Sequence, residues 1–256
     1  MPTRAAALLP FLLALAWAPA ARAGDSLPPH KITYDLSLDG KPIGTRELTI
    51  RYLPREDGER RILEAYTEAT VLGQALVCRS SGQSSPRGAS FTSAIDQGGA
   101  LFQVQGIELP DGGWRLIVED GAGVKETTLA KAQVRLTSLD LLDPGRTALL
   151  AGGGELTLVL VETGTILTGT LDQGTAGTTK VAGKKVEVTR YTATGSGVGG
   201  GSAKFDVDAS GLLVKSELSW LGGTVTAVAR EVPAPRSYGT VETLDAISPG
   251  VIEDEL

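Results

Sequence analysis

The stretch KITYDLSLDGKPIGTRELTI, residues 31–50, decides the fold class. Its first eight residues place apolar side chains at every second position, namely Ile32, Tyr34, Leu36 and Leu38. This alternation is typical of a strand with one buried face. Asp39-Gly40 follows, and this dipeptide favours a tight hairpin turn because both residues tolerate positive φ. Apolar residues then recur at Leu48 and Ile50, so the stretch predicts two antiparallel strands.

Alternating segments of this kind, separated by short glycine-rich connections, recur as far as residue 230. Short connections favour antiparallel neighbours, because parallel strands need a long crossover. Helical periodicity is nearly absent; the best candidate is TSLDLLDPG, where Ser138 would cap a short turn that ends at Pro144. We therefore expect an all-β fold with minor α: a single large curved antiparallel sheet of about a dozen strands, forming an open or half-closed barrel.

The two ends of the chain differ from this β-rich middle. Arg4, the apolar run 5–18 and the small-residue motif ending at Ala23 predict a Sec-type signal peptide over residues 1–23. Gly24 follows the expected cut where a lipoprotein would carry Cys, so a soluble periplasmic or secreted protein is expected. Residues 24–232 then form the antiparallel β domain. Residues 233–256 form a Pro-containing acidic C-terminal tail.

Charge and cysteine content restrict the partners. Without Arg4 and Arg22, 22 basic residues face 30 acidic ones, a net charge of about −8. Such a surface repels nucleic-acid phosphates, so no nucleic acid is expected as a partner. No transmembrane segment is expected in the mature chain. Cys78, the single cysteine, cannot form an internal disulfide, and its place in an alternating run predicts a small buried side chain.

The segment DVDASGLLVKSE, residues 206–217, matches an EF-hand calcium loop with Asp206, Asp208, Ser210 and Glu217 at ligand positions. An EF-hand needs a helix on each side of its loop. Here a glycine cluster precedes the segment, and a period-two pattern through Trp220 follows it. We interpret the match as a hairpin with its turn at residues 208–211, and we expect no metal ligand in it.

Catalytic motifs are sparse. The only histidine, His30, precedes the first predicted strand, so a Ser-His-Asp or Cys-His mechanism has no well-placed base. The glycines Gly195, Gly197 and Gly200 form G-x-G-x-x-G, but a strand follows them where a dinucleotide site needs a helix. We expect no cofactor and no enzymatic activity. A pair of carboxylates acting as a glycosidase stays open as an alternative, although the sequence selects no pair.

A curved sheet directs alternate side chains into its concavity. Seven aromatic residues are candidate lining residues for an apolar ligand, and they are Tyr34, Phe91, Phe102, Trp114, Tyr191, Phe205 and Trp220. The alternative is that they fill a dry core, which is the usual role of interior sheet positions.

The segments ITYDLSLDGKPIGTRELTI, LDLLDPGR and RYTATG…KFDVDASGLLVKSEL resemble a family of uncharacterised exported bacterial β-rich proteins, a domain of unknown function. The resemblance covers most of the chain from the expected cleavage site to about residue 230. That family loosely resembles the open-barrel lipoprotein carriers LolA and LolB. This similarity implies a β clam that cups an acyl chain.

Together these features lead us to expect a non-enzymatic periplasmic binding protein that holds an apolar or lipid-like ligand in its curved sheet. The first alternative is an envelope structural or interaction module that pairs with other proteins through its sheet edges or tail. The second is a carboxylate-dependent hydrolase.

Overall fold

The computed structural model describes residues 30–53, 60–85, 88–130, 136–144, 146–196, 202–220 and 222–232. The predicted signal peptide and the whole predicted tail, residues 233–256, lie outside these residues, as do Gly197 and Gly200. The described residues form sixteen strands and two 3-10 helices. The strands of the first half are β1 (His30–Leu38), β2 (Lys41–Leu53), β3 (Arg60–Val71), β4 (Gln74–Ser85), β5 (Gly88–Gln97), β6 (Ala100–Glu108), β7 (Trp114–Asp120) and β8 (Gly123–Leu129).

The second half begins with the short β9 (Leu136–Thr137) and the helices η2 (Asp140–Leu142) and η3 (Thr147–Gly152). Seven strands follow: β10 (Gly154–Leu160), β11 (Thr165–Leu171), β12 (Thr175–Val181), β13 (Lys184–Ser196), β14 (Ser202–Asp208), β15 (Leu213–Trp220) and β16 (Gly223–Ala229). The expected all-β class with minor helix is confirmed. The strand number is higher than the dozen expected, and His30 begins β1 rather than preceding it.

All sixteen strands belong to one sheet, with the order β8-β7-β6-β5-β4-β3-β2-β1-β16-β15-β14-β13-β11-β10-β9 and with β12 paired to β13. Every pairing is antiparallel except that of β9 with β10. The predicted turn at Asp39-Gly40 is confirmed, because both residues have positive φ, 49° and 76°. The antiparallel pairing of β16 with β1 joins the two halves of the chain.

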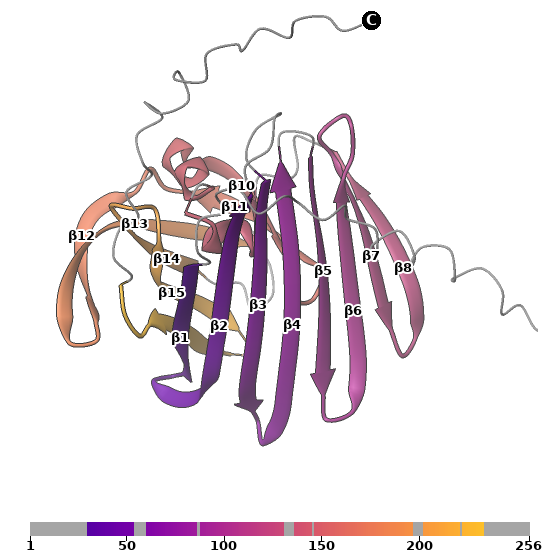
Figure 1. Cartoon of the computed structure of the whole chain (residues 1–256), viewed down its shortest axis with the longest axis horizontal. Coiled ribbons are helices and arrows are strands. Elements are labelled where there is room, and N and C mark those ends of the chain that lie inside the picture. Colours follow the sequence, from indigo (N-terminus) through magenta and orange to yellow (C-terminus); the bar gives the residue numbers. More distant parts are fainter. Residues whose placement is uncertain are drawn as a thin grey trace, which may run out of the picture.

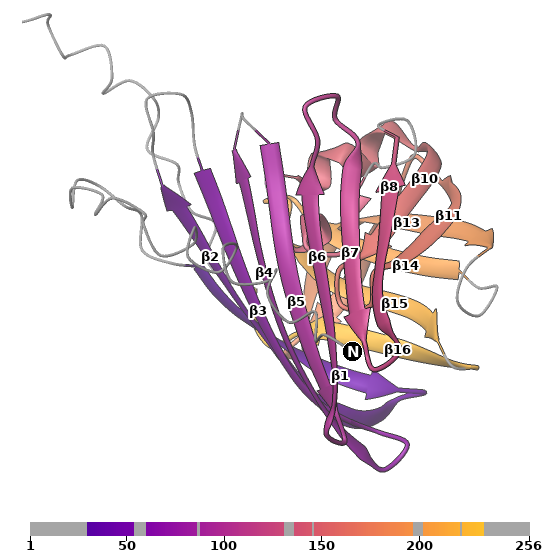
Figure 2. The ribbon, with the colours of Figure 1, turned by 90° about the vertical axis from the view of Figure 1, so that its right-hand side faces the viewer.

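The sheet bends so that two walls face each other across the core (Figures 1 and 2). The hairpin wall comprises β1–β8, in which each strand pairs with its neighbours in sequence. The second wall comprises β10–β16. Alternation in the hairpin wall sends apolar side chains inward, and register aligns them; Ile50 lies opposite Leu63, for example. The inner face of each wall therefore contributes to one shared hydrophobic core.

The crossover from β8 to β10 packs inside this fold. Its leucines Leu139, Leu141, Leu142 and Leu150 are buried in the core. A Cβ added to Gly82 on β4 would lie 2.8 Å from Leu139 Cδ1, so glycine makes room for the crossover against the hairpin wall. The short helical turn expected here exists as η2, but Ser138 does not cap it. Its hydroxyl instead donates to Glu162, 2.7 Å away, because that carboxylate lies close by in the folded chain.

Candidate functional site

Six of the seven predicted lining residues have described side chains, and they lie in or against the core. The rings of Phe91 and Trp114 pack with centroids 5.5 Å apart. Tyr34 is fully buried, and its hydroxyl donates to the Leu213 carbonyl at 2.9 Å, which ties β1 to β15. This burial raises the pKa of Tyr34 far above its usual value.

Among the remaining lining candidates, Tyr191 and Phe205 lie opposite each other on β13 and β14, while Phe102 is partly buried against the core. Trp220 is the last residue of β15. The binding role proposed for these residues stays a prediction.

The residues of the calcium-loop match do not converge. Asp206 forms a two-point ion pair with Arg190, at 2.6 and 2.7 Å. Glu217 lies on β15 and pairs with Lys215 at 2.7 Å. The side chain of Asp208 accepts hydrogen bonds from the backbone and hydroxyl of Ser210, within a β14–β15 hairpin turn. Each candidate ligand therefore has a local structural partner.

A polar cluster lies between the walls. Arg46 on β2 donates to Glu162, in the β10–β11 turn, at 3.2 Å, and to the hydroxyl of Thr67 at 2.9 Å. Glu162 also accepts from Ser138. Both charged side chains are largely buried, with 23 % and 17 % of their area exposed. Burying a charged side chain costs free energy unless the charge is paired. We therefore interpret this cluster as a structural link between the two walls, and we call it the strut.

Cys78 is 3 % exposed, as the sequence predicted for a small buried side chain. Its thiol lies 3.5 Å from the Ser80 hydroxyl and 3.6 Å from that of Ser93, and the two hydroxyls lie 2.8 Å apart. Burial is the main cause of its raised pKa, so the thiol stays protonated and poorly nucleophilic.

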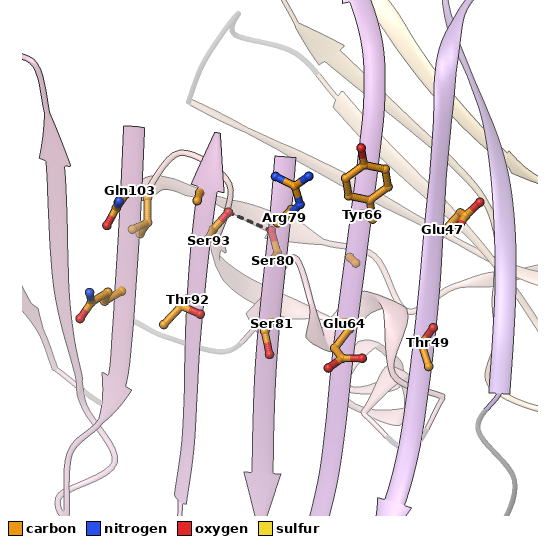
Figure 3. Close-up of a pocket in the computed structure, with 14 residues that line it drawn as sticks. Glu47, Thr49, Glu64, Tyr66, Arg79, Ser80, Ser81, Thr92, Ser93 and Gln103 are labelled. Atoms are coloured by element: carbon orange, nitrogen blue, oxygen red, sulfur yellow. Dashed lines mark hydrogen bonds between the residues drawn. The ribbon is translucent and has the colours of Figure 1, made fainter. Parts of the chain in front are cut away.

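The opposite face of the same strands carries an open hollow of about 590 Å³ (Figure 3). Most of its lining side chains alternate with core residues along β2–β6 and project away from the second wall, whereas Ala65, Ser80, Ser93 and Val104 are buried positions of the same strands. We call this site the outer hollow. Its lining residues are Glu47, Thr49, Glu64, Ala65, Tyr66, Arg79, Ser80, Ser81, Thr92, Ser93, Ala94, Gln103, Val104 and Gln105.

Hydroxyl and amide groups dominate the projecting side chains of the outer hollow. Strand register places Glu47 opposite Tyr66, and Tyr66 opposite Arg79. The Arg79 guanidinium lies 5.1 Å from the centre of the Tyr66 ring. The Tyr66 hydroxyl donates to Glu68, and this bond raises the pKa of Tyr66. The hollow thus presents an aromatic ring beside a cation, surrounded by groups that both donate and accept hydrogen bonds.

No local sequence pattern indicates this site. Its residues come from five strands and share a face only through register. Among the described residues, no group of three or more His, Cys, Asp or Glu side chains is arranged to hold a metal ion. Within the same residues, no helix has the length and apolar character needed to cross a membrane.

Comparisons with known proteins give a structural likeness. No family model and no curated protein matches the chain. The structure is similar to that of a β-barrel-like protein of the domain of unknown function DUF1849 from Brucella abortus, with a TM-score of 0.52 and 12 % sequence identity. The match covers 80 % of this chain and 97 % of that chain. The likeness shows the fold and supports the expected uncharacterised β-rich domain, while the resemblance to LolA and LolB stays a prediction.

Proposed function

We propose that this chain is an exported, non-enzymatic binding protein that holds a hydroxyl-rich ligand, such as a neutral oligosaccharide, in the outer hollow. The observation that carries the proposal is the size and lining of the hollow. Its volume of about 590 Å³ lies within the range of small-molecule sites, roughly 300–1,000 Å³.

The lining chemistry favours a sugar. Thr49, Ser81 and Thr92 offer hydroxyls, and Gln103 and Gln105 offer amides, so donors and acceptors alternate across the surface. A sugar ring presents the same alternation of donors and acceptors. The apolar face of a sugar ring would pack on the Tyr66 ring, whose hydroxyl end remains polar.

The apolar ligand expected from the sequence has less support. The aromatic side chains described above pack with one another and with the crossover leucines in the core. An enclosed acyl chain would have to displace these contacts, whereas a ligand in the outer hollow displaces only water.

Calorimetric titration with chitotetraose and maltotetraose tests the proposal. Tyr66→Ala should weaken binding at least tenfold, a loss of about 1.4 kcal/mol of binding free energy. Gln103→Ala should weaken it severalfold. Gln83→Ala changes the same residue type on the same face but outside the lining, so its affinity should match that of the unmodified protein.

Absence of binding at millimolar concentrations of both probes, or unchanged affinity in Tyr66→Ala, would overturn the proposal. Cleavage of a bound probe is a further outcome, because Glu47 and Glu64 both line the hollow. If cleavage occurs and Glu64→Gln abolishes it, the carboxylate-dependent hydrolase replaces the binding protein.

A further inference from the structure

Three hairpin tips at one end of the hairpin wall expose large apolar side chains. The β3–β4, β5–β6 and β7–β8 turns lie together at this end, which is the lower end in Figure 1. Leu72 is 81 % exposed, Val124 66 % and Leu101 57 %. We call residues 72–75, 98–101 and 121–124 the apolar rim. One large apolar side chain thus extends from each of three successive hairpins.

The apolar rim contains no charged residue. Its three segments read LGQA, GGAL and GAGV. The β6–β7 connection at the opposite end differs, since residues 109–113 read LPDGG and include Asp111. The three rim segments therefore carry no charge of their own, while strand register places Asp96 opposite Leu101 and Glu119 opposite Val124. A surface of this composition favours contact with an apolar medium over contact with water.

Leu72 also adopts a backbone conformation that leucine disfavours. Its φ is 53°, in the left-handed region, and it precedes Gly73 in a two-residue turn. Asp39 occupies the equivalent position in the β1–β2 turn, where polar residues are preferred. Leu72 is therefore neither buried nor in a backbone conformation that leucine prefers. Such outliers cluster at functional positions, which points to a role outside the folding of the turn.

Side-chain carboxylates accept hydrogen bonds from several backbone N–H groups of the apolar rim. Asp96 Oδ1 accepts from the Gly99 N–H at 2.9 Å. Asp120 Oδ1 accepts from the Ala122 N–H at 2.8 Å and from the Gly123 N–H at 3.2 Å. Unsatisfied N–H groups make insertion into lipid costly. These carboxylates satisfy three N–H groups of the rim and reduce that cost.

We propose that the apolar rim docks the protein on the interface of a zwitterionic lipid bilayer. Successive hairpins are two strands apart, so neighbouring apolar side chains lie roughly 10 Å apart along the edge at about 4.8 Å per strand. A row of protruding tips matches a soft interface that admits side chains individually better than it matches the flat surface of a protein. The acidic chain gains nothing from anionic headgroups, which favours a neutral lipid surface. This inference is independent of the proposed ligand in the outer hollow.

Sedimentation with phosphatidylcholine vesicles tests the docking. The purified protein should bind weakly and reversibly, because three side chains bury little area. Leu72→Asn should weaken partitioning about tenfold, the effect of removing a buried leucine side chain. The same change should leave the melting temperature unchanged or raise it, because asparagine tolerates positive φ. The triple variant Leu72→Asn, Leu101→Gln and Val124→Thr should not bind measurably.

Ile107→Gln supplies the matched control. Ile107 is also an exposed apolar residue of β6, at 44 %, but it lies away from the rim. Its change should leave vesicle binding unaltered. All variants share the same termini, so differences among them report on the rim alone. Equal vesicle binding by the triple variant and the unmodified protein overturns the proposal. The proposal is also overturned if the unmodified protein is a dimer that does not bind vesicles and the Leu72→Asn variant is a monomer. The rim would then contact a second copy of the chain.

Discussion

The two faces of the hairpin wall use the same strands for opposite purposes. On the inner face, polar side chains such as Arg46 and Thr67 are buried and bonded to one another or to Glu162 in the β10–β11 turn. On the outer face, Thr92 and Gln105 are exposed in an open hollow. This difference shows that polar residues alone do not identify a binding site in a β wall. Polar groups buried with partners hold the walls together, and exposed polar groups remain available to a ligand.

Adjacent residues on β5 should show the largest difference in stability between the two faces. Phe91 points inward and is 4 % exposed, whereas Thr92 points outward. Phe91→Ala should lower the free energy of unfolding by about 3–5 kcal/mol, because it leaves a cavity beside Trp114 and Gly106. Thr92→Ala should change it by less than about 0.5 kcal/mol. Urea unfolding measures both, and equal losses would show that the two faces do not differ.

A smaller effect is expected from the strut between the walls. Glu162→Gln keeps the side-chain volume but leaves the Arg46 guanidinium without its anionic partner. The free energy of unfolding should fall by about 1–3 kcal/mol. Glu126→Gln removes an exposed partner of Arg115 at the edge of the wall and should have little effect. Similar losses in the two variants would contradict the role of the strut.

The last effect is a dependence of the free energy of unfolding on alkaline pH. Burial raises the pKa values of Cys78 and Tyr34 in the folded protein above their unfolded values of about 8.5 and 10. The unfolded state therefore releases these protons first, and stability falls as pH rises through this range. The slope reaches up to about 1.4 kcal/mol per pH unit for each group.

Urea unfolding between pH 7 and pH 11 measures this slope. Cys78→Ser should flatten the curve from about pH 8.5, and Tyr34→Phe should flatten it from about pH 10. Cys78→Ser keeps a hydroxyl for Ser80 and Ser93, which limits the loss of packing. An unchanged slope in the double variant would mean that the inner face does not hold these groups protonated.

Most strands that alternation predicted have one wet and one buried face, whereas β10 and β14 bury consecutive residues. Four strands do not show a clear alternation of apolar and polar residues, because of their surroundings in the fold. β8 is an edge strand whose residues are mostly exposed, and β12 lies off the main path of the sheet. β9 is only two residues long. In β6, Leu101 and Ile107 point outward while Gly106 points inward, so apolar side chains occur on both faces.

Sequence patterns are limited in the same way when they are used to predict the candidate sites. Six of the seven aromatic residues chosen from the sequence lie in or against the core, at interior positions that alternation indicates. Whether an interior is a cavity or a packed core depends on what enters it, and here the crossover leucines do so. The outer hollow is harder to anticipate, because Thr49, Arg79 and Gln103 are far apart in sequence. Exposed polar residues on several successive predicted strands would have been the only signal.

Local structure follows from short stretches of the sequence: strands from period-two alternation, tight turns from dipeptides such as Asp39-Gly40, and the scarcity of helix. These depend on neighbours within a few residues, where steric preference and side-chain direction act. The folded chain alone brings β16 beside β1, places the crossover between the walls and combines five strands into one hollow. Such features depend on register between distant segments and on the curvature of the whole sheet. No local pattern encodes these, because many pairings satisfy the same alternation.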